Sequence, residues 1–200
     1  MKAHEIRQYE SVLQTLGEQS CPICAFLKNV QTRLLQEGDA EEFVQLCNAH
    51  TWAVAAVRET ETATQIFLSL LESRSDYGSH ECSICLRLEQ EEVLRTSELI
   101  TAFGRRSVLE WMKKQAVLCL PHGLRLRNQA PIGLRALIDQ VLDRRAAELR
   151  ATLTRLTAEA ARGESRRCGV LGRVAEYLTA QRGISLMHAG HLDAQKVDHH

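Results

Sequence analysis

The feature that most constrains the fold of this chain is a pattern of cysteines and histidines that occurs twice. The stretches "EQSCPICAFLK" (residues 18–28) and "SHECSICLRLE" (residues 79–89) each place two thiols three positions apart, just ahead of a helical run. A Cys-x-x-His follows in each half, within "LCNAHTW" and "LCLPHGL". In chain order the residues are Cys21 and Cys24, Cys47 and His50, Cys82 and Cys85, Cys119 and His122. Two copies in the same order predict the same chemistry in both halves.

The spacing within each pair suits a metal ion. Two residues between ligands let a tight turn or a first helical turn aim both side chains at one point, because positions three apart share a helix face. Two such pairs complete a tetrahedron of three thiolates and one imidazole around Zn²⁺, and a shell of four protein ligands is the structural type of zinc site. The sequence therefore predicts two Cys3His zinc sites. Iron–sulfur clusters are the alternative, because thiolates suit both metals.

Which pair joins which is a separate question. Pairing within each half encloses 22 residues between Cys24 and Cys47 and 33 between Cys85 and Cys119, and either loop fits one helical hairpin. The sequence favours this sequential pairing because each half is then a self-contained unit. The alternative is a cross-brace, in which each Cys-x-x-Cys meets the Cys-x-x-His of the other half. His80 is an alternative ligand to His122.

The composition predicts an all-α chain. Leu, Ala, Glu, Arg and Gln, which are helix formers, dominate, and no segment has a convincing strand period. Breaks such as "SRSDYGSH" at residues 73–80 divide the chain. The expected parts are an N-terminal helix (1–17), a first Cys3His helical module (18–75), a second one (76–128), a C-terminal helical hairpin (129–183) with a long amphipathic helix from near Pro131 to about Arg162, and a mobile tail (184–200).

Charge and hydropathy narrow the functional classes. The chain has 25 basic and 25 acidic residues and a formal net charge of zero, which argues against a nucleic-acid partner. No stretch approaches the ~18 uninterrupted apolar residues of a membrane span, and the first 19 residues lack the apolar core of a signal peptide. A cytoplasmic protein is the expectation. Thiols are kept reduced in that compartment, so clustered cysteines point to metal rather than to disulfides.

The motifs also carry a resemblance. The order "CPICAFL", "LCNAHTW", "CSICLRLE", "LCLPHGL", followed by a long Leu/Arg/Glu helix ending in "GESRR" and then "VAEYLTAQRG", resembles a family of uncharacterised bacterial proteins with duplicated Cys-Pro-x-Cys and Cys-x-x-His motifs. It covers roughly residues 18–183. The resemblance implies a helical, metal-binding cytoplasmic protein and no known reaction. Ser83 stands where this pattern would have proline.

Three functional classes follow. The sequence favours a structural-zinc protein that acts as an interaction, assembly or accessory subunit, with a protein partner bound through the long amphipathic helix. The alternative is an electron-transfer or redox-sensing subunit with two Cys3His-ligated iron–sulfur clusters. An enzyme is not favoured, because no open metal position or acid–base constellation is visible in the sequence.

Overall fold

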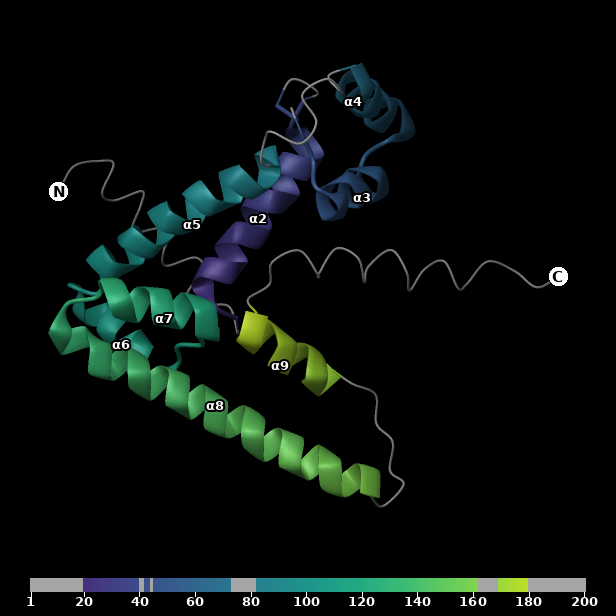
Figure 1. The fold of residues 1–200 in the computed structure, drawn as a ribbon. Helices are drawn as coiled ribbons and strands as arrows, with labels where there is room; N and C mark the ends of the chain where they lie inside the picture. Colours follow the sequence, from purple (N-terminus) through teal and green to yellow (C-terminus); the bar gives the residue numbers. More distant parts are fainter. Residues whose placement is uncertain (1–19, 40–41, 44, 73–81, 162–168, 180–200) are drawn as a thin grey trace. The chain divides into compact units, whose positions relative to one another are not determined.

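A computed structural model describes residues 20–39, 42–43, 45–72, 82–161 and 169–179. These residues form helices without strands (Figure 1), so the predicted all-α class is confirmed. The helices are α2 (Pro22–Glu37), α3 (Asn48–Val57), α4 (Thr60–Glu72), α5 (Ser83–Ala102), α6 (Arg106–Lys114), α7 (Leu120–Gln129), α8 (Ile132–Ala161) and α9 (Gly169–Thr179). The predicted N-terminal helix at 1–17 and the tail at 184–200 lie outside the described residues.

The described residues fall into two compact units, and each is assembled from parts of the chain that are distant in sequence. Unit 1 holds the described residues of 20–26 and 94–179, and unit 2 holds those of 27–93. The boundary therefore falls inside α2 and inside α5, so both helices contribute residues to both units.

Unit 2 is built around one apolar cluster. Its buried members come from α2, α3, α4 and the start of α5, and from the non-helical segment ahead of α3: Leu35, Phe43, Leu46, Ala53, Val54, Ala63, Ile66, Leu70, Cys82 and Ile84. Arg58, at the end of α3, donates to the carbonyl oxygens of Leu34 and Gly38 at the end of α2. A cation there offsets the partial negative charge of a helix C-terminus. These contacts join the end of α3 to the end of α2 within the unit.

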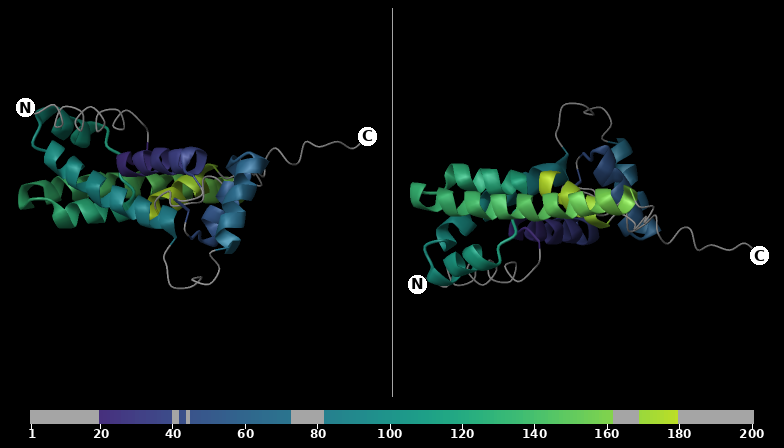
Figure 2. Two further views of the ribbon diagram at one scale, coloured as in Figure 1. Left: turned by 90° about the horizontal axis from the view of Figure 1, so that it is seen from above. Right: turned by 90° about the horizontal axis from the view of Figure 1, so that it is seen from below.

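Unit 1 is organised by α8, which confirms the predicted long helix. α6, α7 and α9 all pack against it (Figures 1 and 2). Its apolar stripe buries Ile138, Val141, Leu142 and Leu149. A Cβ on Gly123 of α7 would overlap the Leu142 side chain, so the absence of a side chain at this position allows α7 to approach α8 closely.

Two arginines tie down the segments that carry cysteines in unit 1. Arg144 of α8 donates to the carbonyl oxygens of Lys113, at 2.7 Å, and Ala116, at 3.1 Å, just ahead of α7. Arg95 of α5 is 2% exposed and lies 4.7 Å from the ring centroid of Phe26, which is in the second turn of α2. Both contacts hold the starts of α2 and α7 in place.

A helix that crosses a membrane needs about 20 predominantly apolar residues. None of the described helices is both long enough and apolar enough to cross a membrane.

Candidate metal centres

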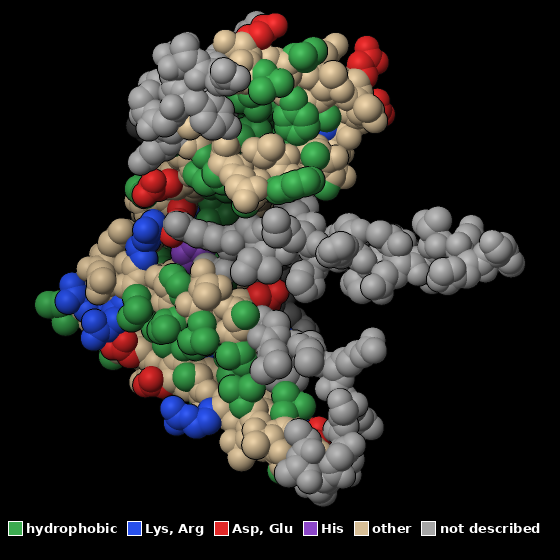
Figure 3. All heavy atoms as spheres, turned by 45° about the vertical axis from the view of Figure 1, so that its right-hand side comes forward, with side chains coloured by type: hydrophobic (Ala, Val, Ile, Leu, Met, Phe, Trp, Pro, Cys, Tyr) green, Lys and Arg blue, Asp and Glu red, His purple; other side chains and the backbone are tan. Residues whose placement is uncertain are grey.

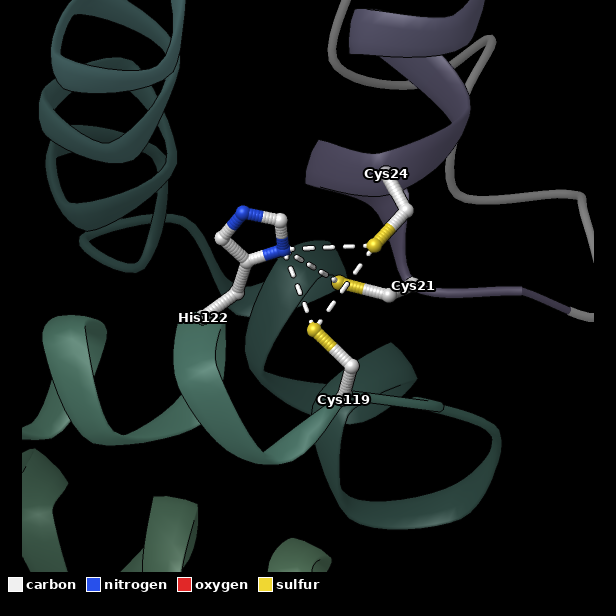
Figure 4. Close-up of side chains that lie close together, drawn as sticks. All are labelled: Cys21, Cys24, Cys119 and His122. Atoms are coloured by element: carbon white, nitrogen blue, oxygen red, sulfur yellow. Dashed lines mark hydrogen bonds between the residues drawn. The ribbon is translucent and has the colours of Figure 1, made fainter. Parts of the chain in front are cut away.

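The first centre joins the start of α2 to the start of α7, and all four of its side chains are buried. Cys21 and Cys24 face Cys119 and His122 (Figure 4). Nδ1 of His122 lies 3.1 Å from the sulfur of Cys119, 3.3 Å from that of Cys24 and 3.6 Å from that of Cys21. The sulfurs of Cys24 and Cys119 are 3.6 Å apart. The four side chains are between 1% and 5% exposed, so this centre is sealed from solvent.

The second centre joins the start of α3 to the start of α5, within unit 2. Nδ1 of His50 lies 3.3 Å from the sulfurs of Cys47 and Cys82 and 3.5 Å from that of Cys85. The sulfurs of Cys47 and Cys85 are 3.9 Å apart. His50 and Cys82 are buried, whereas Cys47 is half-buried and Cys85 is exposed. The two centres share their residue types and differ in their access to solvent.

The sequential pairing favoured by the sequence is wrong. Each Cys-x-x-Cys meets the Cys-x-x-His of the other half, which is the cross-brace alternative, and His122 rather than His80 completes the first group. The second centre is therefore nested in sequence between the two pairs of the first.

Helix lengths explain this pairing. α2 has 16 residues, so it carries the chain about 24 Å away from Cys21. The described residues that follow are not helical, and two of them, Phe43 and Leu46, are buried in the core of unit 2. In the second half α5 has 20 residues and α6 has nine. Their lengths are about 30 and 14 Å, so α6 is too short to return the chain to the start of α5.

The same local geometry places all eight side chains. The first residue of each pair stands just ahead of a helix, and its carbonyl oxygen accepts the first helical hydrogen bond, at 2.9 Å in all four cases. The second residue of each pair then lies in the first helical turn, on the same side. Each centre consequently receives two helix N-termini. Their partial positive charge stabilises thiolates, as negative charge is favoured at that end of a helix.

The ligand atoms are spaced as a single tetrahedral ion requires. With bonds of about 2.3 Å to sulfur and about 2.0 Å to nitrogen, two sulfurs are about 3.8 Å apart and sulfur and nitrogen about 3.5 Å apart. The sulfur–sulfur distances of 3.6 and 3.9 Å agree with that geometry. In each centre the four ligand atoms all lie within 4.8 Å of one another. Each group is thus a compact Cys3His set that fits one metal ion.

Mutual repulsion between the sulfurs also favours a cation. Burial and the charge of Cys82 raise the pKa of Cys85 to about 12. Hydrogen bonding between Cys119 and the thiols of Cys21 and Cys24, together with burial, raises the pKa of Cys119. Burial opposes the ionisation of Cys21, but its hydrogen bonds with Cys119, Cys24 and His122 lower the pKa of this thiol well below its ordinary value. Three sulfurs this close are not ionised together without a positive charge among them.

Gln31 is a contributor that sequence reasoning missed. Its side-chain amide, in α2, lies 3.1 Å from Nε2 of His50, on the side of the ring opposite to the sulfurs. A histidine that binds metal through Nδ1 carries its proton on Nε2, and a partner there fixes the ring's tautomer and orientation. The amide atom at this distance is the nitrogen of Gln31. Rotating the amide by half a turn exchanges its nitrogen and oxygen, and the oxygen then accepts the proton from Nε2 of His50. The signal in the sequence was weak, being one polar residue on the buried face of α2.

Replacing Gln31 by alanine is expected to weaken metal binding at the second centre by roughly 10- to 100-fold, because the ring of His50 loses the partner that orients it. The first centre should be unaffected. Competition against a chromophoric chelator, with the two binding steps resolved, measures both affinities. Gln90→Ala, on exposed surface of the same unit, is the matched control. If Gln31→Ala weakened both metal-binding steps equally, or weakened neither, Gln31 would not be the residue that orients His50.

Models of protein families, curated proteins and solved structures were all compared with the chain, and none of them matches it. The resemblance to the bacterial family therefore stays an expectation.

Proposed function

We propose that the chain is a structural metal protein whose two Cys3His centres each hold one Zn²⁺ ion and thereby fix the starts of four helices. The observation that carries the proposal is the convergence of four Cys/His pairs, distant in sequence, into two compact Cys3His groups. Chance burial of thiols does not explain why each group contains three sulfurs and one imidazole nitrogen, with the same atom, Nδ1, facing the sulfurs in both.

The spacing of the ligand atoms supports a single ion over an iron–sulfur cluster. In a cluster the ligands bind different irons, so their atoms are spread farther apart than around one ion. Here all four ligand atoms of each centre lie within 4.8 Å of one another. Zinc is preferred among single ions because it takes four ligands of this kind in tetrahedral geometry.

A structural role is supported by the number of protein ligands. Catalytic zinc sites have three protein ligands and keep the fourth position for water or substrate, whereas both groups here supply four. Metal binding at such sites contributes directly to folding. The ions would join segments that the chain separates widely, since the first centre links residues 24 and 119.

An interaction role completes the proposal. Within unit 1 the middle of the α8 stripe, from Ile138 to Leu149, is buried, whereas Leu153 and Leu156, farther along the same stripe, are half-buried. This last part of α8 is where we place a protein partner. Unit 2 also has exposed hydrophobic side chains on α3 and α4, namely Trp52, Leu68 and Leu71. Figure 3 shows that hydrophobic side chains reach the surface of the molecule in groups. Apolar side chains exposed in groups are typical of interaction surfaces.

Metal analysis of protein purified without oxygen tests the proposal directly. Two zinc ions per chain and no visible absorption are the expected result. A brown protein that contains iron and sulfide would contradict the zinc proposal and favour the iron–sulfur alternative. Protein that binds no metal, even after zinc is added under reducing conditions, would remove both.

Zinc binding is expected to release protons. In the absence of metal the raised pKa of about 12 keeps Cys85 protonated across neutral and mildly alkaline pH, and the pKa of Cys119 is raised as well. A thiol must lose its proton before its sulfur binds the ion, so affinity rises with pH throughout this range. If the metal-free chain is unfolded, zinc affinity still rises with pH near neutrality. An ordinary thiol has a pKa of about 8.5, so it is also protonated there and must lose its proton on binding. Calorimetric titration in two buffers of different ionisation enthalpy counts the protons, and at least one per ion is expected at pH 7. Identical heats in the two buffers would contradict the expectation.

A further inference from the structure

The two centres have the same ligands and opposite access to solvent. Every side chain of the first is at most 5% exposed. In the second, His50 and Cys82 are buried while Cys47 is half-buried. Among the six cysteines that the structure describes, Cys85 is the one classed as exposed. Two centres with a purely structural role would not need to differ in solvent exposure. A thiolate that solvent can reach can also react with dissolved oxidants, whereas a buried thiolate cannot.

We propose that the second centre is a site of reversible thiol oxidation by hydroperoxides, in which Cys85 is the thiolate that reacts and Cys47 is the one that resolves it. The inference rests on the proposed metal binding, because the ion holds these sulfurs as thiolates at neutral pH. Susceptibility to oxidation follows thiolate character and exposure, and a resolving thiol nearby is typical of such sites.

The chemistry balances with a hydroperoxide as the oxidant. The Cys85 thiolate attacks one peroxide oxygen, the O–O bond breaks, and the products are a sulfenic acid on Cys85 and one hydroxide or alkoxide. The Cys47 thiolate then attacks the sulfenic sulfur, the S–O bond breaks and a second hydroxide leaves. The two sulfurs have lost two electrons, the peroxide has gained them, and solvent protons neutralise both leaving groups.

The geometry favours this pair of sulfurs. The sulfurs of Cys47 and Cys85 lie 3.9 Å apart. Cys47 stands just ahead of α3, whereas Cys85 lies in the first turn of α5. Cys82 is buried, so Cys47 is the better-exposed neighbour of Cys85. The new S–S bond takes up two of the four side chains that would hold an ion, so a bound ion would be released from this centre. The bond itself keeps the start of α3 joined to the start of α5, so a thiol reductant and fresh metal can restore the centre.

The first centre is the internal reference. It has the same three sulfurs and one nitrogen, and the sulfurs of Cys24 and Cys119 are even closer, at 3.6 Å. If proximity of sulfurs alone governed oxidation, this centre would react at least as fast. If access governs it, as we propose, the first centre keeps its ion under conditions that empty the second.

The test uses the full chain with both ions bound, in a Cys168→Ser background that removes the cysteine outside both groups. The zinc content measured before any peroxide is added tests the proposed metal binding separately from the oxidation. Hydrogen peroxide is then added, released zinc is followed with a chromophoric chelator, and oxidised thiols are mapped by differential alkylation and mass spectrometry. We expect one ion per chain to leave roughly tenfold or more faster than the other, with the disulfide at Cys47 and Cys85. Equal release of both ions, or oxidation that begins at Cys21, Cys24 or Cys119, overturns the inference and leaves metal binding intact.

A pair of histidine variants provides a second measurement. Cys85→His keeps four ligands, of a kind zinc accepts, and removes the sulfur that reacts, so zinc release by peroxide should slow at least roughly tenfold. Cys24→His makes the same exchange at the matching position of the first centre and should leave the fast phase unchanged. An unchanged fast phase in Cys85→His would also overturn the inference.

Discussion

Replacing His122 by alanine is expected to remove one ion per chain and to unfold unit 1. His122 is 1% exposed, and its Nδ1 faces all three sulfurs of the first centre. A structural zinc site contributes on the order of 10 kcal/mol to folding, which is comparable with the whole stability of a typical domain. Loss of the ion therefore leaves too little to hold the starts of α2 and α7 together.

Three measurements check this result. Metal analysis should fall from two zinc ions to one, helical circular dichroism at 222 nm should drop, and hydrogen exchange should become fast in peptides from α7 and α8. His80→Ala is the matched control, since it removes a histidine that the sequence offered as a ligand, and it should keep both ions. A His122→Ala protein that retains two ions and slow exchange in α7 would contradict the role given to this residue.

The second large effect is expected at Arg95. Replacement by alanine should lower the free energy of unfolding by about 3–5 kcal/mol, the range for breaking a buried ion pair. The guanidinium is 2% exposed, stacks over Phe26 and lies 3.0 Å from a carboxylate oxygen of Glu98. Its removal leaves a cavity against α2 and takes the partner away from Glu98. Phe26 follows Cys24 by two residues, so the first centre should also bind its ion more weakly.

Arg87→Ala is the control for this prediction. Arg87 is on the same helix and also pairs with a glutamate, Glu91, at 2.9 Å, but its side chain is 55% exposed. An exposed pair of this kind contributes at most about 1 kcal/mol. Chemical denaturation of the metal-loaded proteins compares the two variants. Similar losses for both would mean that burial of Arg95 does not have the importance we assign to it.

The sequence predicted the residues of the two groups better than the way in which their pairs combine. All eight residues of the two groups could be found from spacing alone, because Cys-x-x-Cys and Cys-x-x-His place ligands on one side of a helix start irrespective of what lies farther along the chain. The extent of α8 was also predictable, since apolar residues recur at helical spacing from Leu134 to Leu156. Both are local properties.

The pairing depended on information that is not local. The favoured pairing assumed that the chain returns after α2, and the burial of Phe43 and Leu46 in unit 2 shows that it does not. Helix lengths were a usable signal, because α5 and α6 differ by 11 residues and cannot form a matched hairpin. The roles of Gln31 and Arg95 could not be assigned from the sequence, since they depend on which side chains the fold brings to these residues.

The measurement that tests the central claim most directly counts zinc ions in two double variants by native mass spectrometry. Cys24→Ser with Cys119→Ser damages only the first centre, so this protein should keep one ion per chain. Cys24→Ser with Cys47→Ser damages both centres and should keep none. Pairing within each half requires the reverse, with no ion in the first variant and one in the second. That reversed result would contradict the two centres as described.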